Sequence, residues 1–188
     1  MSGNPGVALK SIKESYFSGD EGQKISCIRD SFELNTGASR AFIVAVAKDR
    51  SVSTAVRDEA IFFVGLFAQT YLKVLKRLAL DRTEVDEVRN RAADSIGDMF
   101  ERCRKCRSFQ TAVGILCQCL ADPSPEVRFT ACYSLGKMRA KSALACLSRL
   151  RQEDNAVSAY GSVSQQAGHS IDFIIRASRK LRLTLDQD

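Results

Sequence analysis

Tryptophan is absent from the sequence, histidine occurs once, and only three of the 188 residues are proline. Nucleophilic catalysis of the Ser-His-Asp or Cys-His type would have to use the single histidine, His169. No glycine-rich loop with the spacing of a phosphate-binding motif is present. The sequence therefore predicts no catalytic residues and favours a binding protein over an enzyme.

Long apolar stretches are also lacking. The longest runs, residues 41–47 and 60–68, are too short to span a bilayer and read as buried helix. Residues 1–17 contain no apolar core of the kind a signal peptide needs. Charged residues make up 27% of the chain, which together with the few prolines argues against disorder. We expect a soluble, cytoplasmic protein without membrane insertion.

The sequence does contain a repeated helical pattern, clearest in residues 122–136, D-P-S-P-E-V-R-F-T-A-C-Y-S-L-G. Pro125 suits the first turn of a helix, where a missing N–H costs nothing, and Ser124 is placed to cap that helix. Aliphatic and small residues then recur at four-residue steps, which puts them on one buried face. They are Val127, Ala131 and Leu135.

The pattern consists, in order, of an aliphatic residue, Arg, Ala, a second aliphatic residue and Gly, and it occurs again elsewhere in the sequence. Complete copies begin at Val56 and Val88, and partial copies begin at Ile28 and Val163. The five starting positions, that at Val127 included, are 28 to 39 residues apart, the period of helical solenoid repeats. The sequence therefore predicts an all-α array of helix pairs.

An acidic residue precedes each starting position, in the turn between the two helices of a repeat. A carboxylate accepts two N–H bonds from a guanidinium, so Asp–Arg couples in phase can hold the angle between stacked repeats. We expect each Asp to reach an Arg of its own repeat or the next, in a structural rather than a catalytic role. The predicted ladder consists of Asp49, Arg57, Asp81, Arg89, Asp122 and Arg128.

The segment 122–136 and the copies at Val56 and Val88 resemble the HEAT repeat, most closely its short bacterial, phycobilisome-lyase-like form. The resemblance covers nearly the whole chain and implies a right-handed α-α superhelix of about five antiparallel helix pairs. It also implies that the second helices line a concave face. We expect one domain, 1–188, with repeats at approximately 6–37, 38–68, 69–103, 107–139 and 141–185.

Seven cysteines, an odd number without a secretion signal, predict reduced thiols. Cys103 and Cys106 have the spacing of half a zinc site, but Cys117 and Cys119 point to different helix faces and complete it poorly. Deoxyhypusine hydroxylase is also built of such repeats, yet it needs several His-Glu metal pairs that this sequence lacks. We expect neither a metal nor a cofactor.

The net charge of +6 is uneven, because residues 1–94 carry +1 and residues 95–188 carry +5. A basic cluster, Arg102, Arg104, Lys105 and Arg107, suits phosphates or an acidic protein. HEAT-like DNA glycosylases place aromatic residues against DNA, and the lack of tryptophan weakens that resemblance. Nucleic-acid binding is kept as a second alternative.

An extended concave surface suits a protein partner. The free positions of the second helices are expected to line it, and Phe129 and Tyr133, one turn apart, are candidates for an exposed aromatic anchor or for packing against the next repeat. The predicted partner-binding residues are Phe129, Tyr133, Arg91, Asp94, Gln165 and His169. The favoured function is a non-enzymatic scaffold.

The first alternative follows from the resemblance, which extends to subunits of phycobilin lyases. These enzymes attach a tetrapyrrole to an antenna protein or detach it. In that case the same groove would hold a bilin, with Tyr133, His169 and a nearby Arg contacting its propionates.

Overall fold

A computed structural model describes residues 4–101, 103 and 105–185, with side chains described as far as residue 177. In this part of the chain the structure consists of ten α-helices, two 3-10 turns and one short β-hairpin. The helices are α1 (Pro5–Ser18), α2 (Glu21–Leu34), α3 (Gly37–Lys48), α4 (Thr54–Leu66), α5 (Leu72–Leu80), α6 (Asp86–Glu101), α7 (Phe109–Cys119), α8 (Pro125–Lys137), α9 (Leu144–Glu153) and α10 (Val163–Leu185). The 3-10 turns η1 (Gln69–Tyr71) and η2 (Lys141–Ala143) precede α5 and α9.

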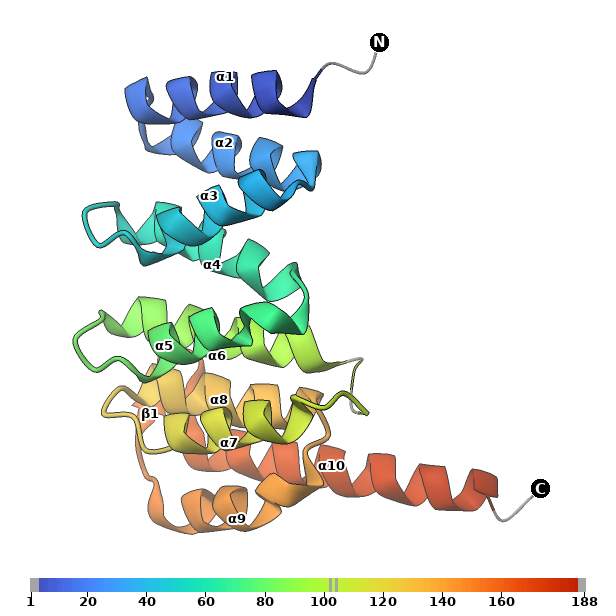
Figure 1. Cartoon of the computed structure of the whole chain (residues 1–188). Helices are drawn as coiled ribbons and strands as arrows, with labels where there is room; N and C mark the ends of the chain where they lie inside the picture. Colours follow the sequence, from blue (N-terminus) through green and yellow to red (C-terminus); the bar gives the residue numbers. More distant parts are fainter. Residues whose placement is uncertain (1–3, 102, 104, 186–188) are drawn as a thin grey trace.

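The helices form five successive pairs that stack along one axis, from α1 and α2 at one end to α9 and α10 at the other (Figure 1). The second helices α4, α6, α8 and α10 pack on one another in order and form one layer, the second-helix layer. The first helices α3, α5 and α7 lie in front of that layer in Figure 1. The predicted all-α solenoid of about five helix pairs is confirmed, and no helix among the described residues is long and apolar enough to cross a membrane.

Capping side chains start several of these helices. Asp20 and Thr36 accept the backbone N–H of the third helical residue at the start of α2 and α3. Pro125 opens α8 as predicted, but the expected cap by Ser124 is wrong. The Ser124 hydroxyl donates to Asp86 and Glu126 instead, at 3.1 and 2.9 Å, because both carboxylates lie within its reach.

The connection between α9 and α10 contains a β-hairpin. Strand β1 (Val157–Ser158) pairs with β2 (Gly161–Ser162) in antiparallel orientation. Gly161 allows the tight reversal because its φ of 126° lies where side chains are rarely accommodated. The hairpin places its tip beside α8, where the backbone N–H of Ala159 donates to Glu126 Oε1 at 3.3 Å.

Small residues let the second helices approach closely. A Cβ atom added to the last glycine of each complete repeat pattern would meet a serine of the following second helix at 2.6 to 2.8 Å. The facing pairs are Gly65 with Ser95, Gly97 with Ser134, and Gly136 with Ser170. Each serine hydroxyl also donates to a backbone carbonyl of the preceding second helix, at 2.8 to 3.2 Å. The glycine and the serine together therefore set the spacing of the layer.

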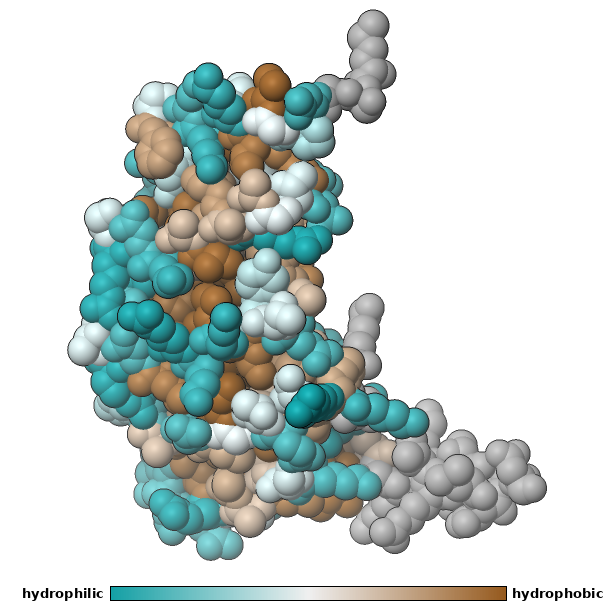
Figure 2. All heavy atoms as spheres, in the orientation of Figure 1, coloured by the Kyte–Doolittle hydropathy of each residue, from teal (hydrophilic) through white to brown (hydrophobic). Residues whose placement is uncertain are grey.

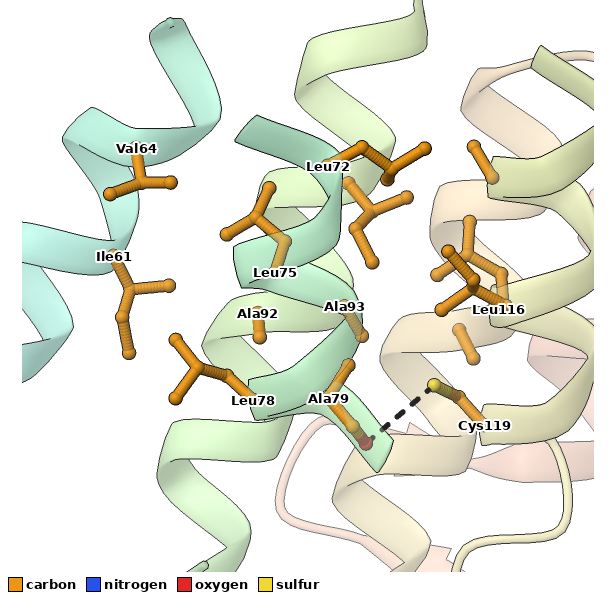
Figure 3. Close-up of a cluster of buried hydrophobic side chains, with 14 of the residues drawn as sticks. Ile61, Val64, Leu72, Leu75, Leu78, Ala79, Ala92, Ala93, Leu116 and Cys119 are labelled. Atoms are coloured by element: carbon orange, nitrogen blue, oxygen red, sulfur yellow. Dashed lines mark hydrogen bonds between the residues drawn. The ribbon is translucent and has the colours of Figure 1, made fainter. Parts of the chain in front are cut away.

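The hydrophobic core runs continuously from one repeat to the next. Figure 3 shows Ile61 and Val64 of α4 facing Leu75 and Leu78 of α5, with side chains of α6 behind α5 and those of α7 on the side of α5 away from α4. The Cys119 thiol lies in this core and points to the carbonyl oxygen of Ala79, 3.9 Å from its Sγ. Burial raises the pKa of Cys119 to about 12, so this cysteine acts as a small core residue.

Candidate functional site

The ladder arginines connect each repeat to the turn of the next. Arg89 donates from Nε and Nη2 to the two carboxylate oxygens of Asp122, both at 2.9 Å. Arg128 reaches Asp154 in the same way, at 2.6 and 3.2 Å. The Asp122 carboxylate is fully buried and is also contacted by Arg82. These contacts join the repeats through the fork geometry expected of arginine and carboxylate.

The predicted direction of the pairing, from each Asp to an Arg of its own repeat or the next, is wrong, because Asp122 and Asp154 bind the arginine of the preceding repeat. Arg57 pairs with Glu84, which is not one of the predicted ladder residues. Its two terminal nitrogens donate to the Glu84 oxygens at 2.8 and 2.9 Å, and these hydrogen bonds hold the pKa of Glu84 below its usual value despite burial. The Asp49 and Asp81 carboxylates accept hydrogen bonds from residues of their own turns. Hydrogen bonds from Ser51 and from Thr83, respectively, are the largest cause of their lowered pKa values.

A groove of about 680 Å³ opens in the second-helix layer between α6 and α8, with the hairpin at one side. Its lining residues come from α4, α6, α8, the hairpin and α10. They are Asp58, Glu87, Asn90, Arg91, Asp94, Phe129, Thr130, Tyr133, Tyr160 and Gln166. We refer to this surface as the α6–α8 groove.

Four of the six predicted partner-binding residues line this groove: Phe129, Tyr133, Arg91 and Asp94. Gln165 and His169 are exposed on α10 but are not among the lining residues, and Gln166 takes their place. The rotation of α10 explains the shift, since its buried face, which includes Val163 and Ala167, fixes which neighbours turn toward the groove.

Tyr160 was not among the predicted residues, and the hairpin brings it to the groove. Its ring lies 5.7 Å from the ring of Phe129, centroid to centroid, and Asn90 Nδ2 approaches its hydroxyl at 3.4 Å. Tyr160 is 60% exposed and Tyr133 is 49% exposed. The three aromatic side chains give the groove an accessible apolar wall.

The positive charges in and beside the groove are already paired. Arg91 donates to Asp58 at 2.7 Å and to Asp94 at 3.4 Å. Lys137 lies 2.5 Å from Asp98 and 5.2 Å from the ring centroid of Tyr133. Burial raises the pKa of Asp94 against the opposing charges of Lys137 and Arg91. Arg91 is therefore poorly placed to offer a free charge to a partner.

The lining as a whole is acidic, although the chain carries a net charge of +6. The lining contains three carboxylates and one guanidinium. They are those of Asp58, Glu87 and Asp94, and of Arg91. A surface with exposed aromatic rings and surplus negative charge suits a ligand that carries positive charge on an apolar stem.

The cysteines do not form a metal site in the structure. Cys103 and Cys106 are paired as a disulfide with Cα atoms 5.6 Å apart, so the expectation that all cysteines are reduced is wrong at this pair. The backbone N–H of Cys106 donates to the carbonyl of Cys103, and this turn brings the two side chains together. Among the described residues, no group of three or more His, Cys, Asp or Glu side chains has a geometry that could hold a metal ion.

The predicted basic cluster is only partly described. Arg102 and Arg104 lie outside the described residues, while Lys105 and Arg107 are exposed in the connection between α6 and α7. This connection is not part of the α6–α8 groove lining.

Comparison with known proteins identifies the repeat type. Residues 86–160 match the family of HEAT repeats. No curated protein matches the sequence. Among solved structures, the chain is similar to the complex of CpcE and CpcF of phycocyanin lyase from Nostoc sp., with 14% identity, a TM-score of 0.65 and coverage of 87% of this chain and 98% of that chain.

A computationally designed armadillo repeat protein for modular peptide recognition is also similar, with 16% identity, a TM-score of 0.57 and coverage of 88% and 82%. An engineered protein gives 17% identity, a TM-score of 0.54 and coverage of 88% and 78%. The predicted HEAT-type repeats are confirmed for residues 86–160, and the similarity to the lyase complex lies at the level of the fold.

Proposed function

We propose that this HEAT-repeat solenoid is a non-enzymatic scaffold whose α6–α8 groove binds a positively charged segment of a protein partner. The observation that carries the proposal is the combination of exposed aromatic rings with surplus carboxylate in one groove. Tyr133, Tyr160 and Phe129 offer π faces to a lysine or arginine side chain, and Glu87 adds charge at the rim. Such a segment supplies the opposite charge without displacing the Arg91 ion pairs.

A tetrapyrrole lyase is the second candidate, and the similarity of fold to the CpcE and CpcF complex favours it. The groove chemistry argues the other way. Propionates need free cations, but Arg91 is held by two carboxylates and His169 lies outside the lining. Nucleic acid is also disfavoured as a ligand, because the carboxylates of the groove repel its phosphates.

The groove proposal predicts a selective loss of binding in Tyr133→Ser. A fluorescent lysine- and arginine-rich peptide is titrated with the protein and followed by anisotropy. Removing the exposed ring is expected to weaken binding by about 10- to 30-fold, the effect of losing one aromatic hot spot of roughly 1.4–2 kcal/mol. Glu87→Gln is expected to weaken it less, with an effect that shrinks as salt is added.

Phe173→Ser is the matched control, because Phe173 is 48% exposed on α10 and is not a groove-lining residue. It is expected to bind the basic peptide like the wild type. Equal losses in Tyr133→Ser and Phe173→Ser would show that the groove is not the binding site. A coloured complex with free bilin, lost in Tyr133→Ser, would favour the lyase candidate instead.

A further inference from the structure

A second pocket, of about 460 Å³, lies among the first helices, away from the α6–α8 groove. Its walls are the end of α3, the following turn, one face of α5 and the turn between α5 and α6. The lining residues are Lys48, Arg50, Lys73, Val74, Arg77, Leu78, Asp81 and Glu84. On the side of the molecule where α3 and α5 face the viewer, Figure 2 shows hydrophobic surface bordered by hydrophilic side chains.

The two carboxylates of this pocket are already neutralised. Glu84 is buried and binds Arg57 through both oxygens, and it also accepts from Arg50 at 3.0 Å. Asp81 accepts from Arg50 at 2.8 Å and from Thr83. Arg50 and Arg57 therefore balance the charges of the two acids. The guanidinium of Arg50 donates three hydrogen bonds, to Glu84, Asp81 and Thr83, which fix its position in the pocket lining.

Three cations remain without a carboxylate partner. Lys48, Lys73 and Arg77 are exposed and line the pocket, and in the described part of the chain none of them forms an ion pair. Arg77 acts on Asp81 only at longer range, as one of the weaker causes that lower its pKa. Like charges that converge on one pocket repel each other unless an anion lies between them.

Helix stabilisation accounts for only part of this arrangement. Lys48 and Arg77 lie in the last turns of α3 and α5, where cations interact favourably with the helix dipole. Lys73 lies in the first turn of α5, where a cation meets the positive end of the dipole. Its side chain is nevertheless on the same helix face as Arg77, four residues later, and both border the pocket.

We propose that this pocket binds a phosphoryl group. A phosphate carries about −1.5 to −2 charges at neutral pH, which matches three unpaired cations better than a single carboxylate does. Arg77 can bind two phosphate oxygens at once, and Lys48 and Lys73 add point charges. Val74 and Leu78 provide an apolar surface for the part of the ligand that carries the phosphate.

The test is calorimetric titration of the full chain with inorganic phosphate, pyrophosphate and a phosphoserine peptide. Lys73→Gln and Arg77→Gln are each expected to weaken phosphate binding by about tenfold, the effect of one lost charged hydrogen bond. The matched control is Lys76→Gln, because Lys76 is exposed on the same helix but does not line the pocket, and it is expected to bind as the wild type does. Circular dichroism checks that all variants are folded.

The absence of saturable binding, or an equal loss in Lys76→Gln and Lys73→Gln, would overturn the proposal. Binding that is unaffected by lowering the pH below about 6, where phosphate loses a charge, would also contradict it. Tighter binding of the phosphoserine peptide than of inorganic phosphate would support the proposal and assign the group to a phosphorylated protein. Equal or tighter binding of the inorganic anions would support it with a small phosphate as the ligand.

Discussion

Gly97→Ala is expected to lower the free energy of unfolding by about 2–4 kcal/mol, although alanine is the better helix former. A Cβ atom at this position would lie 2.6 Å from Ser134 Oγ and 2.7 Å from Ser134 Cβ, inside any tolerated contact. Separating α6 from α8 to relieve the clash would also stretch the hydrogen bond from Ser134 Oγ to the Ala93 carbonyl, now 3.2 Å. Urea denaturation followed by circular dichroism measures the loss.

Gly114→Ala is the control, because nothing lies within 4 Å of a Cβ at Gly114 on α7. The same chemical change is expected to stabilise the chain there by about 0.5–1 kcal/mol, the ordinary gain of replacing a helical glycine. The two substitutions therefore have opposite predicted signs. If Gly97→Ala stabilised the protein as much as Gly114→Ala, the close approach of α6 and α8 would be wrong.

Arg89→Ala is expected to cost about 3 kcal/mol of unfolding free energy. The Asp122 carboxylate, whose side chain is 0% exposed, would lose two hydrogen bonds of 2.9 Å. Breaking a buried ion pair from one side typically costs about 3–5 kcal/mol, and the remaining contacts with Arg82 and Ser124 place this case at the lower end. Thermal and urea melts of the purified variant measure the effect.

Arg29→Ala provides a matched arginine deletion at an exposed ion pair. Arg29 donates to Glu59 at 2.6 Å, but its side chain is 62% exposed, and solvent screens such surface pairs so that they contribute little to stability. The ladder account requires Arg89→Ala to destabilise the chain clearly more than Arg29→Ala. Similar small losses in both variants would mean that the ladder contributes little to the stacking of repeats.

Much of the fold could be read from the sequence, because helix pairs repeat their buried positions and their end signals. The pattern from Val127 to Gly136 gave the bounds of α8 closely, and the glycine at its end was part of the pattern. The role of this glycine, Gly136, in helix packing could not be predicted, because the serine that faces it, Ser170, belongs to the next repeat. Arg57 shows the same limit: Asp81 and Glu84 lie three residues apart in one turn, and only packing decides which of them faces it.

The groove was predictable in part. Phe129 and Tyr133 could be placed on the free face of their helix from periodicity alone, and both line the groove. Tyr160 could not be placed in this way, because it lies in the turn between two short strands. The position of this hairpin depends on contacts with Glu126 and Asn90. On α10 the predicted groove residue was Gln165, whereas Gln166 lines the groove. A sequence pattern does not determine the rotation of a helix to within one residue.

The central claim, that the α6–α8 groove binds a positively charged protein segment, is tested most directly by nuclear magnetic resonance. Isotope-labelled protein is titrated with the lysine- and arginine-rich peptide, and backbone amide shifts are mapped onto the fold. The account predicts saturable shifts concentrated in residues 87–94, 129–133 and 158–161. Shifts confined to the connection between α6 and α7 or to the pocket beside α5, or no saturable shifts at all, would contradict it.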